Sequence, residues 1–154
     1  GLSLAPLAGS DGLIILRSFG KFFGLAGVRL GALIAPASIR NAMAARLGVW
    51  PVSGAALEIG TRAYADTGWQ GSTRTRLKSA AAQLDESLEV AGLAPIGGTN
   101  LFRFVETEDA HGVFGRLARA GVYVRRFDWS TKHLRIGLPA TQTAMKRLEA
   151  ALIL

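Results

Sequence analysis

The sequence contains no cysteine, which excludes disulfide bonds and thiolate metal sites. Its two histidines, His111 and His133, have no partner at the spacing of a metal site, so we expect no bound metal. No apolar run approaches the roughly 20 residues that cross a bilayer. The first nine residues also lack the basic and apolar regions of a signal peptide. We therefore expect a cytoplasmic protein that does not bind membranes.

Acidic residues are also scarce, since 11 aspartates and glutamates stand against 18 lysines and arginines, a formal net charge of +7. A basic balance of this kind can indicate nucleic-acid binding. The basic residues are scattered, however, apart from two close clusters at 74–78 and 125–126. Because no aromatic residues are interleaved with a basic run, we expect anionic small molecules rather than nucleic acid as partners.

The most informative stretch is residues 13–36, in which two apolar runs flank a glycine-rich segment. The runs Leu13–Leu16 and Leu30–Ile34 predict buried strands, the first of them a parallel strand covered on both faces. The 154 residues and the 49% apolar content suit an α/β protein with a substantial core.

The loop between these runs carries Ser18, Lys21 and Arg29. A lysine flanked by phenylalanines and core strands is expected to be partly desolvated, and a desolvated amine is a nucleophile able to form Schiff bases. A hydroxyl and a forked guanidinium suit a nearby phosphate. The alternative is an ordinary surface lysine in a glycine turn beside a strand-edge arginine.

The segment Ser18-Phe-Gly-Lys-Phe-Phe-Gly-Leu-Ala-Gly-Val-Arg-Leu-Gly31 resembles the lysine signature of the class I/II pyridoxal-phosphate aminotransferases of fold type I. In that signature a hydroxyl residue three positions before the lysine and an arginine eight after it bind the cofactor phosphate, positions held here by Ser18 and Arg29. The segment looks most like the threonine-phosphate decarboxylases of cobalamin biosynthesis. Histidinol-phosphate aminotransferases usually have a hydroxyl residue at the position of Gly20.

The resemblance implies roles for further residues. Lys21 would be the catalytic Schiff-base residue for pyridoxal 5′-phosphate, with Ser18 and Arg29 as phosphate ligands. Arg135, within Leu-Arg-Ile-Gly-Leu, resembles the arginine that clamps the substrate carboxylate. Arg125 resembles a second substrate-binding arginine, and strand alternation allows either it or Arg126 to face the site; we favour Arg125. Asn100 is a further candidate in a loop that faces the cleft in relatives.

The expected fold is α/β: the end of the large domain of a pyridoxal-phosphate-dependent transferase, with parallel strands and the lysine loop, then a small α+β C-terminal domain. We predict domain boundaries at 1–70, 71–95 for a linking helix that is capped by Ser72, and 96–154. Residues 95–99 are expected to form a loop, residues 100–105 and 122–124 strands, and residues 134–138 a further strand. Trp50, in a Trp-Pro-Val-Ser segment shared with the decarboxylase branch, is expected to pack in the core.

Family members are about twice as long as this chain, and their lysine lies beyond the midpoint, so the chain is expected to be the C-terminal portion of an enzyme. The expected substrate is a phosphorylated amino acid, foremost L-threonine O-3-phosphate, in a homodimer. Two alternatives stay open: a histidinol-phosphate-type aminotransferase, and a non-catalytic truncated domain.

Overall fold

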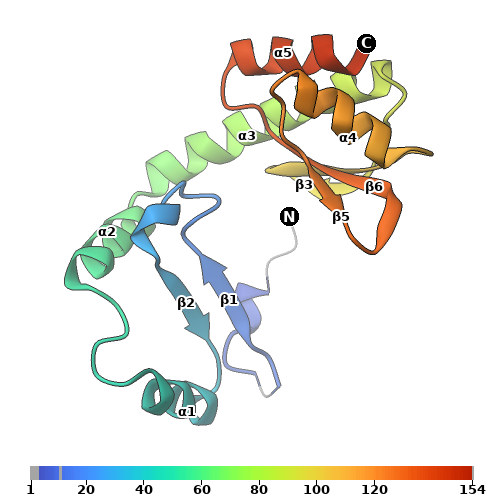
Figure 1. Ribbon diagram of the computed structural model, residues 1–154. Coiled ribbons are helices and arrows are strands. Elements are labelled where there is room, and N and C mark those ends of the chain that lie inside the picture. The colour runs from blue at the N-terminus through green and yellow to red at the C-terminus, as the bar shows by residue number, and fades with distance from the viewer. Residues whose placement is uncertain (1–3, 11, 154) are drawn as a thin grey trace. The chain divides into compact units, whose positions relative to one another are not determined.

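A computed structural model describes residues 4–10 and 12–153 (Figure 1). The chain divides into two compact units, Gly1–Thr67 and Gly68–Leu154. Among the helices of these described residues, none is both long and apolar enough to cross a membrane. The predicted boundaries at residues 70 and 95 stay a prediction.

The first unit is built on one strand pair followed by two helices. Its elements are η1 (Ala5–Leu7), β1 (Ile15–Ser18), η2 (Ala26–Val28), β2 (Gly31–Ile34), α1 (Ala37–Leu47) and α2 (Gly54–Ala65). The two strands pair antiparallel, from Ile15 opposite Ile34 to Ser18 opposite Gly31. The prediction of parallel strands is therefore wrong for this pair. The link between them contains no crossover helix, and a short connection of this kind returns the chain antiparallel.

Two side chains of this unit are far more exposed than their sequence context predicts. Leu16 of β1 is 77% exposed, although its apolar run predicted a strand covered on both faces. Trp50, expected in the core, is 92% exposed because it lies in the irregular segment between α1 and α2. The apolar composition of a segment therefore does not show which of its side chains are buried by the rest of the described chain.

The core of the first unit forms where α2 packs against the lysine loop. Ser53 caps α2, since its hydroxyl accepts a hydrogen bond of 3.2 Å from the Ala56 N–H. One turn further, Gly60 is buried, and a Cβ there would collide with Leu30 and meet the Phe19 ring at 3.4 Å. Glycine at this position lets the helix backbone approach the loop closely.

The second unit is an antiparallel sheet with helices. Its elements are α3 (Thr67–Val90), β3 (Pro95–Thr99), β4 (Phe102–Glu106), α4 (Ala110–Arg119), β5 (Arg125–Phe127), β6 (Ser130–Gly137) and α5 (Gln142–Ile153). The strand order is β3-β4-β6-β5, and each neighbouring pair is antiparallel. The predicted α+β layer is thus present, with an additional strand at its start.

Helices cover one face of this sheet (Figure 1). Val105 of β4 and Leu134 and Ile136 of β6 point to that face and are almost fully buried. They pack with apolar side chains of α3, α4 and α5: Leu84, Leu88, Val113, Leu117, Met145, Leu148, Ala151 and Leu152. Because side chains alternate along a strand, the residues between them lie on the opposite face, which no helix of residues 68–153 covers. We call this the open face.

Three predicted elements differ from the structure. Residues 95–99 form strand β3 rather than a loop, because backbone pairing with β4 overrides the weak strand propensity of proline and two glycines. The helix predicted from Ser72 begins at Thr67 and runs through Gly68. Strand β5 lies at 125–127 rather than at 122–124.

Candidate functional site

The lysine loop brings a hydroxyl and an amine together. The Ser18 hydroxyl accepts hydrogen bonds from the Gly20 N–H at 3.2 Å and from Lys21 Nζ at 3.5 Å. Across the strand pair, the Phe19 N–H donates to the Leu30 carbonyl at 3.4 Å, which closes the base of the loop. The spacing of three between the serine and the lysine therefore has a direct structural meaning: the two side chains touch.

Arg29 ends the loop in a conformation that side chains rarely adopt. It is the one non-glycine residue with positive φ in the described part of the chain, at φ 55°, and its side chain is exposed. A left-handed non-glycine residue costs about 1–3 kcal/mol, and such residues concentrate at functional sites. Its guanidinium donates to the Ala26 carbonyl at 3.3 Å, so the side chain folds back over the loop.

Lys21 itself is exposed, so the expectation of partial desolvation is wrong for the chain as described. The neighbouring rings turn away from it to form their own cluster. Phe19 stacks on Phe23 at 5.2 Å between ring centroids, and Tyr64 of α2 meets both rings edge-on at 5.0 and 5.4 Å. The aromatic residues anchor the loop to α2, and the Lys21 amine lies exposed beside the Ser18 hydroxyl.

In the second unit, Arg125 of β5 lies directly opposite Arg135 of β6. Directly opposed residues of an antiparallel pair share a face, so both arginines lie on the open face. Arg126 is opposed to the buried Leu134 and lies on the helix side, where its guanidinium is 3.4 Å from His111 Nδ1. The structure thus separates the two adjacent arginines as strand alternation requires.

Each open-face guanidinium lies over an aromatic ring. Arg135 Cζ is 5.3 Å from the centroid of Phe102, and Arg125 Cζ is 5.5 Å from that of Phe127. Neither arginine takes part in the ion pairs found among the described residues, which include those of Arg62, Arg103 and Lys132. Two like charges directly opposite each other destabilise a sheet. Their arrangement leaves two cations available for anions.

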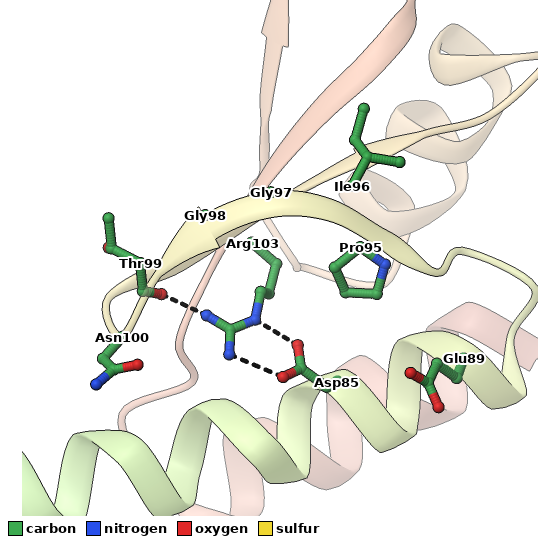
Figure 2. A pocket seen from close by; sticks show the side chains of 9 residues that line it. All are labelled: Asp85, Glu89, Pro95, Ile96, Gly97, Gly98, Thr99, Asn100 and Arg103. Carbon is green, nitrogen blue, oxygen red and sulfur yellow. Dashed lines mark hydrogen bonds and ion pairs between the residues drawn. The ribbon is translucent and has the colours of Figure 1, made fainter. Parts of the chain in front are cut away.

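Asn100 lies apart from these arginines, in the turn between β3 and β4. It lines a pocket of about 550 Å³ between that turn, edge strand β3 and helix α3 (Figure 2). The pocket opens on the helix side of the sheet, because Asp85 and Glu89 of α3 form its other wall. The second unit does not bring Asn100 together with Arg125 and Arg135.

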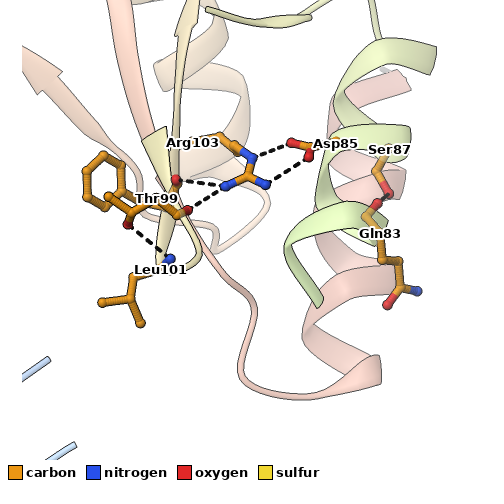
Figure 3. Close-up of polar contacts among 7 residues, drawn as sticks. Gln83, Asp85, Ser87, Thr99, Leu101 and Arg103 are labelled. Carbon is orange, nitrogen blue, oxygen red and sulfur yellow. Dashed lines mark hydrogen bonds and ion pairs between the residues drawn. The ribbon is translucent and has the colours of Figure 1, made fainter. Parts of the chain in front are cut away.

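The turn that carries Asn100 is fixed by Arg103 (Figure 3). Its guanidinium forms two hydrogen bonds to the Asp85 carboxylate, one of them 2.8 Å from Nη2 to Oδ2, and a third to the Thr99 carbonyl. These hydrogen bonds lower the pKa of Asp85 and raise the pKa of Arg103. The Arg103–Asp85 ion pair, on the helix side of the sheet, therefore connects the β3–β4 turn to α3.

Two features of this unit were missed from the sequence. The Arg103–Asp85 pair joins residues 18 positions apart, beyond any helical spacing. On the open face, His133 and Trp129 join Phe104 and Phe127 in a contiguous aromatic group. The alternation of side chains along a strand could have placed His133 on the same face as Arg135. The position of Trp129 could not be predicted, because it lies in a turn where side chains do not alternate. Among the described residues, no group of histidine, aspartate or glutamate side chains could hold a metal ion.

Comparison with known proteins identifies the family. The sequence model of the family described as aminotransferase class I and II matches residues 3–152. The threonine-phosphate decarboxylase of Pseudomonas aeruginosa is 41% identical over 151 residues, which cover 98% of this chain and 45% of that protein. Histidinol-phosphate aminotransferase 1 of Legionella pneumophila is 32% identical over 133 residues, 82% of this chain and 36% of that protein. The chain belongs to the aminotransferase class I and II family.

The structure agrees with this assignment. The histidinol-phosphate aminotransferase of Sinorhizobium meliloti, solved in complex with pyridoxal 5′-phosphate, superposes with a TM-score of 0.79 at 23% identity, over 91% of this chain and 40% of that one. The expected α/β fold is therefore confirmed, and the expected cofactor is the one held by a protein of this fold. The chain spans less than half the length of the relatives that it matches.

Proposed function

We propose that this chain forms part of a pyridoxal-phosphate-dependent enzyme that acts on a phosphorylated amino acid, with decarboxylation of L-threonine O-3-phosphate as the leading reaction. The observation that carries the proposal is the opposed pair Arg125 and Arg135 on the open face. Neither guanidinium forms an ion pair with a carboxylate of the described residues. Binding of an anionic substrate would explain why the two cations lie opposite each other.

The directions of the two side chains favour a ligand with two separate anionic groups. Phe102, beneath the Arg135 guanidinium, is opposed to Gly137, two residues beyond Arg135. Phe127, beneath the Arg125 guanidinium, lies toward the β5–β6 turn. The guanidiniums therefore reach toward opposite ends of β6. A carboxylate on Arg135 and a phosphate on Arg125 would match this separation, because arginine binds both groups in a bidentate manner.

The lysine loop fits pyridoxal phosphate by its donor set. It offers a primary amine at Lys21 for the aldehyde, a hydroxyl at Ser18 and a guanidinium at Arg29 for the phosphate. The exposed amine is accessible, and the Ser18 contact orients it. When bound, the cofactor would supply the electron sink for the bond that breaks.

The chain's own residues would then orient the substrate and move a proton. Arg135 would hold the α-carboxylate and fix which bond of the α-carbon is aligned to break. Arg125 would hold the phosphate at the far end, which uses binding energy for orientation. In decarboxylation, the bond between the α-carbon and the carboxylate breaks, carbon dioxide leaves, and the Lys21 amine would deliver one proton to that carbon.

Gly20 favours the decarboxylase branch over the aminotransferase branch. A Cβ at Gly20 would lie 3.2 Å from Ala26 Cα and 3.4 Å from its Cβ, so any larger residue requires Ala26 to shift. A hydroxyl residue at this position, usual in histidinol-phosphate aminotransferases, therefore fits this loop poorly. The greater identity to a threonine-phosphate decarboxylase, 41% against 32%, supports the same choice.

The first experiment tests cofactor binding by the chain. Pyridoxal phosphate is added to the wild type, to Lys21→Ala and to the control Lys146→Ala, whose lysine is exposed on α5. A new absorbance band in the wild type and control that is absent in Lys21→Ala supports the proposal. Equal spectra from all three proteins would favour the alternative of a non-catalytic truncated domain, which the limited coverage of the relatives keeps open.

The second experiment separates the two reactions in the longest version of the protein that binds cofactor. Release of carbon dioxide from threonine phosphate without a keto-acid acceptor supports decarboxylation. Glutamate-dependent turnover of histidinol phosphate would instead establish the aminotransferase. The same proposal includes a homodimer and a cytoplasmic location. Sedimentation analysis tests the homodimer, and cell fractionation tests the location.

A further inference from the structure

Four rings form a continuous surface at the β5–β6 turn, which we call the aromatic hairpin cluster: Phe104, Phe127, Trp129 and His133. His133 stacks on Phe104 with ring centroids 4.9 Å apart and planes 6° apart. Trp129 lies 5.0 Å from Phe127 and 5.3 Å from His133. Phe104 and Phe127 meet edge-on at 5.6 Å. The four rings thus contact one another in a closed group on the open face.

Polar contacts in the turn hold the cluster in place. Ser130 Oγ shares a hydrogen bond of 2.6 Å with His133 Nδ1, and the same oxygen accepts the Lys132 N–H at 3.2 Å. The strand register shifts between Arg126 and Phe127, so that Phe127 is opposed to Ser130 at the turn. An irregularity of this kind redirects side chains. The ring contacts and these hydrogen bonds together fix the cluster on the open face.

Trp129 is 68% exposed in spite of these contacts, whereas the other three rings are half-buried. Large apolar rings usually lose more of their surface than this, and an exposed aromatic at the rim of a polar site commonly contacts a ligand. The exposed indole is on the Arg125 side of the site, because Phe127 contacts both the Trp129 ring and the Arg125 guanidinium.

We propose that Trp129 is a specificity-determining residue that contacts the substituent on the phosphate-bearing carbon of the substrate. The inference rests on the proposed function, in which Arg125 holds the phosphate. A phosphate on Arg125 brings its ester carbon next to the aromatic hairpin cluster. An indole there favours a methyl group on that carbon, as in threonine phosphate, over the hydrogen of serine phosphate, because the methyl is removed from water.

The test compares the affinities of the two phosphorylated amino acids for the chain. Calorimetric titrations with O-phospho-L-threonine and O-phospho-L-serine are carried out on the wild type and on Trp129→Ala. Burial of one methyl group predicts about a fourfold preference for phosphothreonine in the wild type. The preference is expected to fall to about one in Trp129→Ala and to persist in part in Trp129→Phe. The ratio of the two affinities is informative because a general loss of structure would lower the affinity for both ligands alike.

Tyr123→Ala is the matched control. Tyr123 is also an exposed aromatic of the second unit, at 87%, but it contacts Phe114 of helix α4 rather than the cluster. This variant is expected to keep the wild-type preference. As a second readout, the indole N–H resonance of Trp129, assigned from Trp129→Phe, should shift with phosphothreonine and not with unphosphorylated L-threonine.

The outcomes distinguish this inference from the proposed function. Binding that is lost in Arg125→Ala, with an unchanged ligand ratio in Trp129→Ala, overturns the role of Trp129 and leaves the function standing. An equal loss of preference in Tyr123→Ala would also overturn it. If neither ligand binds the wild type, or if Arg125→Ala binds both ligands with wild-type affinity, the proposed anion site and the role of Trp129 are both refuted.

Discussion

Removing the Asp85 carboxylate should destabilise the second unit, since Arg103 would lose its charged partner. The Arg103 side chain is 13% exposed and that of Asp85 is 34% exposed, so the pair is largely but not fully desolvated. In Asp85→Asn, the guanidinium keeps its contact with the Thr99 carbonyl but loses its counter-charge. The turn that presents Asn100 is then less firmly attached to α3.

The magnitude follows from the geometry. Hydrogen bonds to charged groups contribute about 1.5–3 kcal/mol, and the partial exposure of Asp85 puts the expected loss for the pair near 2 kcal/mol. With an m-value of about 2 kcal/mol/M, this shifts the urea midpoint by about 1 M. Helix propensity cannot account for such a change, because asparagine and aspartate have nearly equal values.

The assay is a double-mutant cycle with Asp85→Asn, Arg103→Met and the double variant, followed by urea unfolding with circular dichroism. The coupling free energy should be about 2 kcal/mol. The control cycle uses Lys132 and Glu108, whose side chains are 48% and 90% exposed and whose coupling should be clearly smaller, because solvent screens an exposed ion pair. A coupling for Asp85 and Arg103 no larger than that of the control would refute the reasoning.

The same pair predicts a pH dependence. Because the pKa of Asp85 is lowered in the folded chain, its contribution to stability is present above the unfolded value, about pH 4, and is lost as the pH falls through the folded value. Wild-type stability should therefore fall more steeply below pH 4 than that of Asp85→Asn. Parallel curves in this range would contradict the assignment.

Three further substitutions test individual parts of the structure. Gly60→Val should destabilise the first unit by about 1–3 kcal/mol, measured by urea unfolding, because its side chain would collide with Leu30. Gly98→Ala should cost more than about 1 kcal/mol in the same assay, since φ is 141° and a Cβ would run into the Phe102 carbonyl. Arg126→Ala should leave phosphothreonine binding unchanged in calorimetry, because this arginine lies on the helix side of the sheet.

The sequence predicted the position of the lysine loop correctly, between strands β1 and β2, because apolar runs and glycines are local signals. The contact between Ser18 and Lys21 was not predicted, although an interval of three residues is short enough for a loop to bring the two side chains together. Strand alternation similarly separated Arg125 from Arg126, since neighbouring residues of a strand point to opposite faces. Both predictions depended on a few covalently close residues and needed no knowledge of tertiary packing.

Predictions that depended on distant neighbours fared worse. Strand β3 was missed because its proline and two glycines have weak intrinsic strand propensity, and its pairing with β4 decides its conformation. The desolvation of Lys21 was wrong because Phe19 and Phe23 pack on Tyr64, some forty residues away, rather than on the lysine. The substrate-binding role of Asn100 stays a prediction, and the residue lines a pocket beside α3.

The arginines of the sheet show how neighbours, rather than residue type, distinguish an arginine with a structural role from the two for which we propose ligand binding. Arg103 points to the helix side and has a carboxylate and backbone carbonyls as partners, so its donors are already used. Arg125 and Arg135 point to the open face and lie over rings, which attract a cation weakly and leave its N–H donors free. A fold that needed only stability would place a carboxylate opposite one of them, since an opposed like-charge pair is unfavourable by up to about 1 kcal/mol. That unfavourable placement is better explained by recognition of an anion than by stabilisation of the sheet.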